Sequence, residues 1–435
     1  MNKKNLSTQP YRGSRDFYPE DMRYRNYMFD IWRKVCKSYG FEEYDGPFIE
    51  SFDIYAAKSG EEIVNEQLYS FEDRGGRKVA IRPEMTPTVA RMVAQKHKEL
   101  TWPVKWFSIP NLWRYEKPQR GRLREHFQLN VDIFGDENVT SDFEVINIAV
   151  DIMKAFGATS KTCEIRISNR RLIDDIYDLF EIPDNKKSVV SKCIDKIRKV
   201  TPDEFQDLLS NSSQLTSAQI DYITKFLQDP KPFMDRLSKD SRGTKEIEQL
   251  IGLFEKSENR LYVKFDPSIM RGFDYYTGSV FEQFDLNPNN TRSMYGGGRY
   301  DDLVDEFIDT KIPGVGWGMG DVTMKLFLEN WKLLPDITSS IEYFVTLWPE
   351  DKENKFFSAS NKISNELRKL GKSVDSYLTP NTKLDKQLKY ADKKDIRNVI
   401  IIGDKEIESE SITVKDMSTG KQETKRFDDF LNGLK

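Results

Sequence analysis

Arginine and acidic side chains gather in two β-prone segments that a short basic loop joins. The segments span residues 104–116 and 126–134, and the loop, 117–124, contains glycine and proline, which favour a turn. The sequence therefore predicts an antiparallel hairpin with a cationic tip. Arginines on paired strands can converge on a polyphosphate, because planar guanidinium groups form paired hydrogen bonds to phosphate oxygens. Composition alone leaves a solvated charged hairpin equally open.

Several other chemistries lack the residues they need. The chain has two histidines, His97 and His126, and three cysteines that form no Cys-x-x-Cys pair. A zinc site is therefore short of ligands, so we predict no metal held by protein side chains alone, and Ser/His/Asp or Cys/His nucleophiles are poorly supplied. The sequence also lacks a Gly-x-x-x-x-Gly-Lys-Ser/Thr loop and a Gly-x-Gly-x-x-Gly after a strand, which gives P-loop and Rossmann sites no support. The chemistry must rest on Arg, Glu, Gln and Tyr.

The order of residues in the hairpin resembles motif 2 of the class II aminoacyl-tRNA synthetases. In that motif an arginine and an acidic residue end one strand, and a Gly-Arg-x-Arg-x-Phe-x-Gln pattern opens the next. The matching residues here are Arg114 and Glu116, then Gly121, Arg122, Arg124, Phe127 and Gln128. The resemblance implies an ATP site on an antiparallel sheet, contacted by Arg114, Glu116 and Arg122. It also implies that Gln119 and Arg124 contact the acceptor end of tRNA.

A second motif, Arg-Gly-Phe-Asp-Tyr-Tyr-Thr-Gly at 271–278, resembles a signature of the histidine-specific members of that class. By this resemblance Arg271 contacts the substrate carboxylate and the α-phosphate, so Arg114 and Arg271 are the expected catalytic residues. Tyr275 and Tyr276 are expected to line the histidine pocket. Standing alone, the segment would also suit a turn followed by a strand with an exposed aromatic pair.

Two further segments resemble parts of the same histidine site. Ser-Met-Tyr-Gly-Gly-Gly-Arg-Tyr-Asp at 293–301 resembles the second histidine signature, and we expect its glycines to permit positive φ and close approach of the backbone to a ligand. Residues 81–87 resemble the loop that receives the substrate ammonium group. The resemblance assigns histidine contacts to Glu84, Thr86, Gln128 and Asp132, the last as acceptor from the imidazole.

The chain departs from the class at motif 3. There the class has Glu-Arg, and the arginine packs on adenine, whereas this sequence has Val322 and Thr323. A threonine cannot supply a cation over the base, an interaction worth roughly 0.5–2 kcal/mol. We hypothesise that another group covers the nucleotide, with Arg299 as the candidate.

The order of predicted elements indicates an α+β protein with a class II synthetase antiparallel-sheet core, an inserted helical domain and a C-terminal α/β domain resembling the family's anticodon-binding module. A helix is predicted over 23–39, before Pro47, which corresponds to the motif 1 proline and suits a strand edge or an interface. Further strands are expected at 163–168, 261–265 and 279–284, and a helix at 321–331. The predicted domains are 1–168 and 260–333 (core), 169–259 (helical insert) and 341–435 (anticodon-binding).

Composition sets limits on location and partners. The net charge of −4 argues against non-specific coating of nucleic acid, and no run of about 18 apolar residues could span a bilayer. The cysteine pattern and the lack of an apolar leader favour a reducing cytoplasm. The resemblance implies a homodimer that uses ATP with bound Mg²⁺, and L-histidine and tRNA as substrates, without membrane or DNA partners.

The implied reaction is ATP-dependent ligation of L-histidine to its cognate tRNA through a histidyl-adenylate. Two alternatives stay open. One is a regulatory paralogue without catalysis, and the other is a synthetase-like RNA-binding or sensor protein that the motif 3 change has inactivated. Histidine-dependent exchange between ATP and pyrophosphate separates both from an active enzyme.

Overall fold

The computed structural model describes residues 6–56, 63–237, 240–270, 275–290, 293–349 and 354–434. The chain divides into two compact units: the first comprises residues up to 16 and 25–334, and the second comprises 17–24 and 335–435. Among the described residues, no helix is both long enough and apolar enough to cross a membrane.

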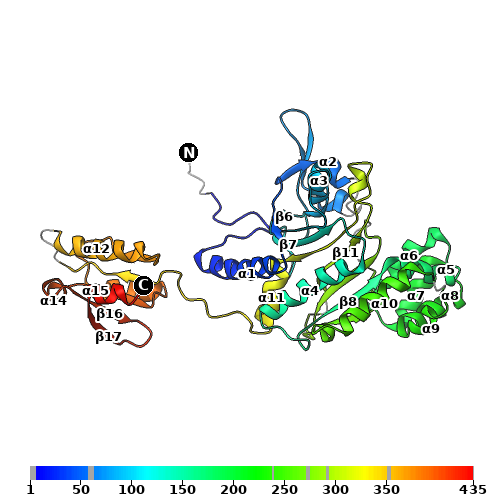
Figure 1. The fold of residues 1–435 in the computed structure, drawn as a ribbon. Coiled ribbons are helices and arrows are strands. Elements are labelled where there is room, and N and C mark those ends of the chain that lie inside the picture. The colour runs from blue at the N-terminus through cyan, green and yellow to red at the C-terminus, as the bar shows by residue number, and fades with distance from the viewer. Residues whose placement is uncertain are drawn as a thin grey trace. The chain divides into compact units, whose positions relative to one another are not determined.

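A large twisted sheet forms the centre of the first unit (Figure 1). Within the described residues its order is β1-β5-β7-β12-β11-β10-β8-β9, with β6 also paired to β7. The strands are β1 (Glu42–Glu43), β5 (Val104–Ser108), β6 (Asn111–Trp113), β7 (Glu125–Phe134), β8 (Cys163–Asn169), β9 (Val263–Phe265), β10 (Ser279–Asp285), β11 (Ser293–Tyr300) and β12 (Gly314–Gly320).

The sheet is mixed, although most of its pairings are antiparallel as predicted. The exceptions are β1 with β5 and β8 with β9, which run parallel. Parallel strands need a long crossover connection, and between β8 and β9 the chain makes this crossover through the helical insert. The strand expected at 261–265 is also shorter, because residues 260–262 form a 3-10 turn before β9.

One face of this sheet is packed against helices. The helices are α1 (Pro19–Ser38), α4 (Val139–Ala155) and α11 (Asp321–Asn330). Leu129, Val131 and Ile133 of β7 are buried in one cluster with Trp32 of α1 and Ile146 of α4. Because successive side chains of a strand point to opposite faces, the residues that alternate with them, Gln128 and Asp132 among others, face the other side of the sheet.

A small antiparallel sheet, β2-β4-β3, and short helices flank the large sheet. They are β2 (Ile49–Ser51), α2 (Phe52–Ala56), a π-helical turn (Ile63–Gln67), β3 (Ser70–Glu72), β4 (Lys78–Ile81) and α3 (Thr86–Lys96). Pro47 lies between β1 and β2 and belongs to neither strand, so the expected place at a strand edge is wrong. Its neighbours Phe48 and Ile49 are 41% and 45% exposed.

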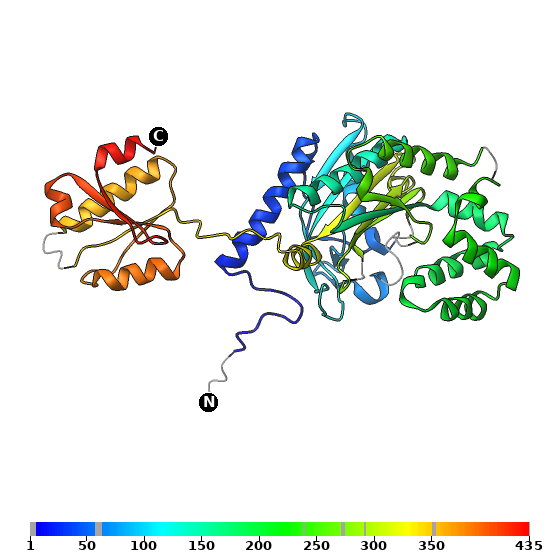
Figure 2. The ribbon, with the colours of Figure 1, turned by 90° about the horizontal axis from the view of Figure 1, so that it is seen from below.

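Helices occupy the chain between β8 and β9 and gather beside one end of the sheet (Figure 2). They are α5 (Arg170–Leu179), α6 (Asp184–Ile194), a 3-10 turn (Ile197–Lys199), α7 (Pro202–Ser213), α8 (Ser217–Gln228), α9 (Lys231–Met234) and α10 (Arg242–Glu255). Thr201 and Glu204 form the capping box that their spacing predicts at the start of α7, and Thr216 with Gln219 forms another at α8. These reciprocal bonds satisfy amides that a helix start leaves open.

The second unit contains a sheet of order β14-β13-β15-β16-β17 with helices around it. Its first three strands are mutually parallel and the last two pairings are antiparallel. The elements are β13 (Tyr343–Val345), α12 (Lys355–Lys369), β14 (Val374–Ser376), α13 (Leu384–Lys393), β15 (Asn398–Ile401), α14 (Asp404–Glu408), β16 (Ser411–Asp416), β17 (Gln422–Arg426) and α15 (Phe427–Asn432). This is the α/β arrangement that the alternating pattern predicts.

Candidate active site

A cavity of about 1080 Å³ lies over the polar face of the large sheet. Three groups of residues line it. The hairpin contributes Arg114, Glu116, Arg122, His126 and Gln128; strands β11 and β12 contribute Gly296, Gly297, Gly318 and Gly320; and the remainder includes Tyr276, Glu282, Val322, Thr323 and Lys192 of α6. The structure therefore brings two of the predicted phosphate-binding arginines, Arg114 and Arg122, and part of the predicted histidine pocket to one cavity.

Glycines of β11 form part of the cavity floor, for a reason other than the one expected. None of residues 296–298 has a positive φ; they continue the strand. A Cβ on Gly297 would lie 2.3 Å from the backbone oxygen of Gly316, and one on Gly298 would lie 2.7 Å from that of Ser279. Glycine is needed because neighbouring strands and rings leave no room for a side chain. The result is a floor of bare backbone that a flat ligand can approach.

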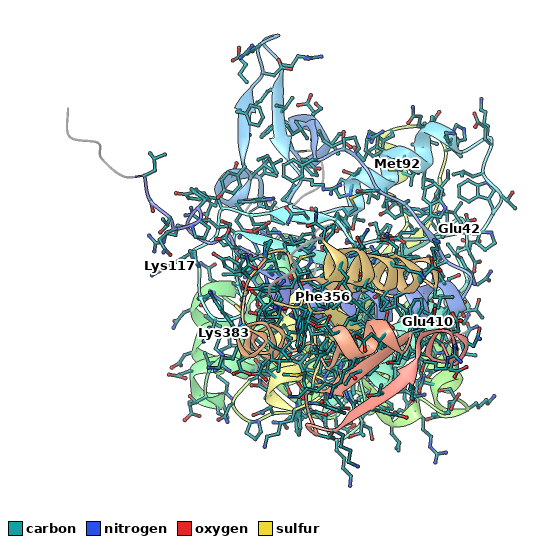
Figure 3. The ribbon with its side chains drawn as sticks, turned by 90° about the vertical axis from the view of Figure 1, so that its left-hand side faces the viewer. Glu42, Met92, Lys117, Phe356, Lys383 and Glu410 are labelled. Carbon is teal, nitrogen blue, oxygen red and sulfur yellow. The ribbon has the colours of Figure 1, made fainter. Side chains whose placement is uncertain are left out.

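The hairpin holds Arg114 and Arg122 at the cavity. Strand β6 pairs with β7, with Trp113 opposite Glu125, and the Arg114 amide donates to the Arg124 carbonyl at 2.8 Å. Arg114 Nε donates to the Pro83 carbonyl at 2.9 Å, so the guanidinium is anchored at one nitrogen. Arg122 lies 3.5 Å from Glu116 and is 49% exposed. Lys117, also exposed in this loop, is marked in Figure 3.

His126, which sequence reasoning did not select, lines the cavity. Counted along the Gly-Arg-x-Arg-x-Phe-x-Gln pattern from Gly121, the aromatic place falls on residue 126, so the match of Phe127 to that place is wrong by one residue. Phe127 faces the opposite side, packing on Phe29 with ring centroids 5.5 Å apart and lying under the Arg25 guanidinium. Burial lowers the pKa of His126 to about 3, and the charges of Arg114 and Arg15 add to the effect. The ring is therefore neutral at physiological pH. The alternation along β7, counted back from Gln128, is the signal that could have identified it.

The residues assigned to the substrate amino group lie together behind the cavity. Tyr275 donates its hydroxyl to Glu84 Oε2 at 3.0 Å and also hydrogen-bonds the Thr86 side chain. The rings of Tyr275 and Tyr276 stand edge to face with centroids 5.0 Å apart. Glu84 is buried, at the end of the loop that leads into α3. Acceptor oxygens and aromatic rings thus lie in contact with one another, and Tyr276 among them also lines the cavity.

Asp132 has an acceptor oxygen that no described residue satisfies. Its side chain is 2% exposed; one oxygen accepts from the Tyr300 hydroxyl, and Oδ2 has no hydrogen-bond partner among the described residues. Burial raises the pKa of Asp132 to about 7, although the Tyr300 hydrogen bond opposes the shift. A buried carboxylate with an open oxygen can accept an N–H group from a ligand.

Arg299 does not lie where the sequence led us to expect it. The side chain is 2% exposed, and Nε donates to both oxygens of Asp142 at 3.2 and 3.1 Å. Its other nitrogens donate to the carbonyls of Asp136 and Asn138 and to Asp301. The hypothesis that Arg299 covers a nucleotide is therefore wrong, because a guanidinium held by these buried acceptors has no access to the cavity. Arg299 instead stabilises the sheet through these buried ion pairs and hydrogen bonds.

The two residues assigned to tRNA differ in their surroundings. Arg124 is buried: Nη1 donates to the Tyr11 hydroxyl at 2.7 Å, Nε donates to the Glu116 carbonyl at 3.1 Å, and the guanidinium lies 3.9 Å from the Tyr115 ring centre. The expectation that Arg124 contacts tRNA directly is therefore wrong, because its guanidinium is buried against the Tyr11 and Tyr115 rings. Gln119 is exposed in the hairpin loop and borders a second cavity of about 900 Å³, beside residues of the helical insert.

Arg271 lies outside the described residues. At the motif 3 position, Thr323 Oγ1 donates to the carbonyls of Gly320 and Met294, each at 3.1 Å. Val322 and Thr323 both line the cavity. The start of α11 therefore presents a small neutral wall where the class usually has an arginine.

A glycine-floored, mostly antiparallel sheet with an arginine hairpin over one face is the catalytic fold of the class II aminoacyl-tRNA synthetases. A crystal structure of histidyl-tRNA synthetase from Nostoc sp. has this fold with a TM-score of 0.84, at 24% identity and covering 99% of each chain. A family model described as histidyl-tRNA synthetase matches residues 13–320, and one described as anticodon binding domain matches 345–435. The chain belongs to the histidyl-tRNA synthetase family.

Two curated relatives agree with this assignment. The histidine–tRNA ligase of Leptospira biflexa serovar Patoc is 45% identical over all of this chain and 99% of its own length. That of Haloarcula marismortui is 38% identical over 94% of each chain. Both are similar along both units, so the similarity is not confined to the cavity.

The position of Arg299 generates a stability prediction. Arg299→Ala leaves Asp142 and Asp301 buried without this cation, and we expect the free energy of unfolding to fall by about 3–5 kcal/mol. The control is Arg77→Ala, which removes an ion pair to Asp73 of 2.7 Å from an arginine that is 79% exposed; the expected loss is about 1 kcal/mol or less. Urea denaturation followed by tryptophan fluorescence measures both. Equal losses would contradict a bracing role for Arg299.

Proposed function

We propose that this chain ligates L-histidine to its cognate tRNA, using ATP and a histidyl-adenylate intermediate. The observation that carries the proposal is the cavity itself. Arg114 and Arg122 form one group of lining residues and offer cations for phosphates, while Gln128 and Tyr276 form a second group, with Asp132 on the same face of β7 as Gln128. Bare glycine backbone connects the two. An amino acid and a nucleotide can therefore bind side by side, as adenylate formation requires.

At the amino-acid end, each proposed contact suits one group of histidine. The acceptors Glu84 and Thr86 would bind the ammonium group, and Gln128 would assist. Asp132 Oδ2 would accept the imidazole N–H, with the Tyr275 and Tyr276 rings closing the pocket. A site built to pair a buried polar atom rejects analogues that lack the partner, because that atom then stays unsatisfied.

At the phosphate end, the substrate carboxylate would attack the α-phosphorus in line and pyrophosphate would leave. Arg114 and Arg271 are proposed to hold the α-phosphate as negative charge grows, and Arg122 the γ-phosphate. The nucleotide substrate is MgATP, and the carboxylates of Glu116 and Glu282 at the cavity are the oxygen ligands that Mg²⁺ prefers. His126, neutral and flat, is proposed to border the base.

The second step would move histidine to the terminal adenosine of tRNA. We propose that residues 341–435 bind the anticodon, that 169–259 form the helical insert, and that 1–168 and 260–333 form the core. Gln119 would contact the acceptor end. We further propose a homodimer, for which the exposed apolar pair Phe48 and Ile49 beside Pro47 offers surface. We also propose that the protein acts in the cytoplasm, where its three buried free cysteines stay reduced.

Adenylate formation is the direct test. Wild-type protein should catalyse exchange of pyrophosphate into ATP that depends on histidine. Arg114→Ala should lower kcat for this exchange by about 10²–10³-fold, since a fixed donor facing growing charge is worth about 2.7–4 kcal/mol. Arg74→Ala, an exposed arginine in the β3–β4 turn, is the control and should change nothing. Absence of exchange in wild type would refute the proposal and favour a non-catalytic relative.

The raised pKa of Asp132 predicts a pH dependence of histidine use. A carboxyl group with a pKa of about 7 loses its proton as pH rises from 6 to 8, which leaves Oδ2 as a charged acceptor for the imidazole N–H. The KM for histidine should therefore fall over this range. Asp132→Asn keeps the shape but cannot titrate, so its profile should retain only the titration of free histidine. Superimposable profiles for the two proteins would remove Asp132 from the imidazole contact.

Truncation tests whether the two units carry separate steps of the reaction. A chain that ends at Leu334 should fold and activate histidine, because the cavity residues precede this point and the first unit is compact. Charging of tRNA should fall steeply, since the proposed anticodon contacts are gone. Exchange and charging assays on the full and shortened chains compare the two steps. Unchanged charging would show that residues 341–435 do not read the anticodon.

A further inference from the structure

The segment of residues 11–15, here called the N-terminal strap, crosses the beginning of β7. In Figure 1 the blue chain ahead of α1 runs to the β6–β7 hairpin and returns. The amides of Arg124 and Glu125 both donate to the Gly13 carbonyl, at 2.9 and 3.1 Å, and the Arg15 amide donates to Glu125 Oε2 at 3.2 Å. Gly13 has φ of +89°, and a Cβ there would lie 2.8 Å from Arg124 Cγ. The strap is thus fitted closely to the hairpin.

The Arg15 side chain carries the contact further, to the first residue of α11. Its Nη2 lies 2.8 Å from Asp321 Oδ2, and the two side chains are 22% and 3% exposed. The other oxygen, Asp321 Oδ1, accepts the Phe127 amide at 2.9 Å. One buried carboxylate therefore ties three segments distant in sequence: the strap, the start of β7 and the start of α11.

Asp321 depends on its cation. Burial raises the pKa of this carboxyl group, and the charge and hydrogen bond of Arg15 oppose the rise. Removing Arg15 would leave a buried carboxylate without this ion pair, which is costly in a site of low polarity. The bond to the Phe127 amide would weaken with it, because a charged acceptor binds an N–H more strongly than a neutral one.

The residues next to these contacts are cavity residues. His126 lies between Glu125, which binds the strap, and Phe127, which binds Asp321; Gly320 and Val322 flank Asp321. His126, Gly320 and Val322 all line the cavity, whereas Arg15 and Asp321 do not. The Arg15 charge also contributes to the low pKa of His126. Arg15 therefore lies close to the side of the cavity that His126, Val322 and Thr323 line, here called the nucleotide wall. A shift of α11 against β7 would therefore move the nucleotide wall.

We propose that Arg15 is a positioning residue for the nucleotide half of the cavity, acting through Asp321 to hold the start of α11 against β7. The inference rests on the proposed function only for the identity of the ligand, ATP. Through this contact the strap sets the distance between His126 on one side and Val322 and Thr323 on the other. The histidine half, built from Glu84 and Asp132 on other contacts, does not depend on Arg15.

A double-mutant cycle on the full-length protein tests the proposal, with MgATP affinity measured by calorimetry and both KM values by exchange. Arg15→Ala should weaken MgATP binding and raise the ATP KM about tenfold, while the histidine KM stays within about twofold. Arg15→Lys, which keeps the charge, should recover much of the loss. Because the effect runs through one contact, Arg15→Ala should add little in an Asp321→Asn background.

The control is Arg33→Ala in α1, which removes an ion pair of 2.9 Å to Glu43 away from the cavity and should leave both KM values unchanged. Additive effects of Arg15→Ala and Asp321→Asn would overturn the proposal, as would parallel losses of ATP and histidine affinity. Asp321→Asn preserves the side-chain shape, so it tests the contact even if Arg15→Ala does not fold. Calorimetry measures the effect of Arg15 on MgATP affinity even if the protein catalyses no exchange. A failure of this proposal can therefore be distinguished from a failure of the proposed reaction.

Discussion

The architecture of the site depends on the two-sided character of β7. Its apolar side chains, Leu129, Val131 and Ile133, are buried under α1 and α4, and this packing leaves a single register for the strand, since a slip by one residue would exchange its two faces. The same register turns His126, Gln128 and Asp132 to the opposite side. Core packing on one face and ligand chemistry on the other are therefore consequences of a single constraint.

Buried ion pairs connect this sheet to the helical insert. Arg299 of β11 binds Asp142 and Asp301, and Asp301 in turn binds Arg171, which also pairs with Glu246 of α10 at 2.8 Å. Such networks are costly to desolvate and add little net stability over an apolar core, but removal of one partner leaves a buried charge uncompensated. Thr277 donates to Asp301 at 3.1 Å, so the network also reaches the segment that carries Tyr275 and Tyr276.

The departure from motif 3 changes the electrostatics of the nucleotide wall. The Thr323 hydroxyl bonds two backbone carbonyls, and His126 is held neutral by burial and by the cations around it. Among the described residues, the positive charge at the cavity comes from Arg114 and Arg122 of the hairpin and from Lys192 of α6. The charged pair at the start of α11, Arg15 with Asp321, lies behind the wall and supports it from outside the cavity.

The sequence by itself determined the order and type of most elements, the hairpin with its arginines, the capping box at Thr201 and the family, because these follow from local patterns of residue type and spacing. Only the tertiary structure decided which side chains reach the cavity. A glycine motif does not reveal whether its glycines are needed for a turn or for close packing between strands, as residues 296–298 show. Likewise, an arginine in a signature can be buried in ion pairs with acidic residues distant in sequence, as Arg299 is. Such contacts depend on strand register and on segments such as 11–15 that meet only in the folded chain, and no local pattern encodes that meeting.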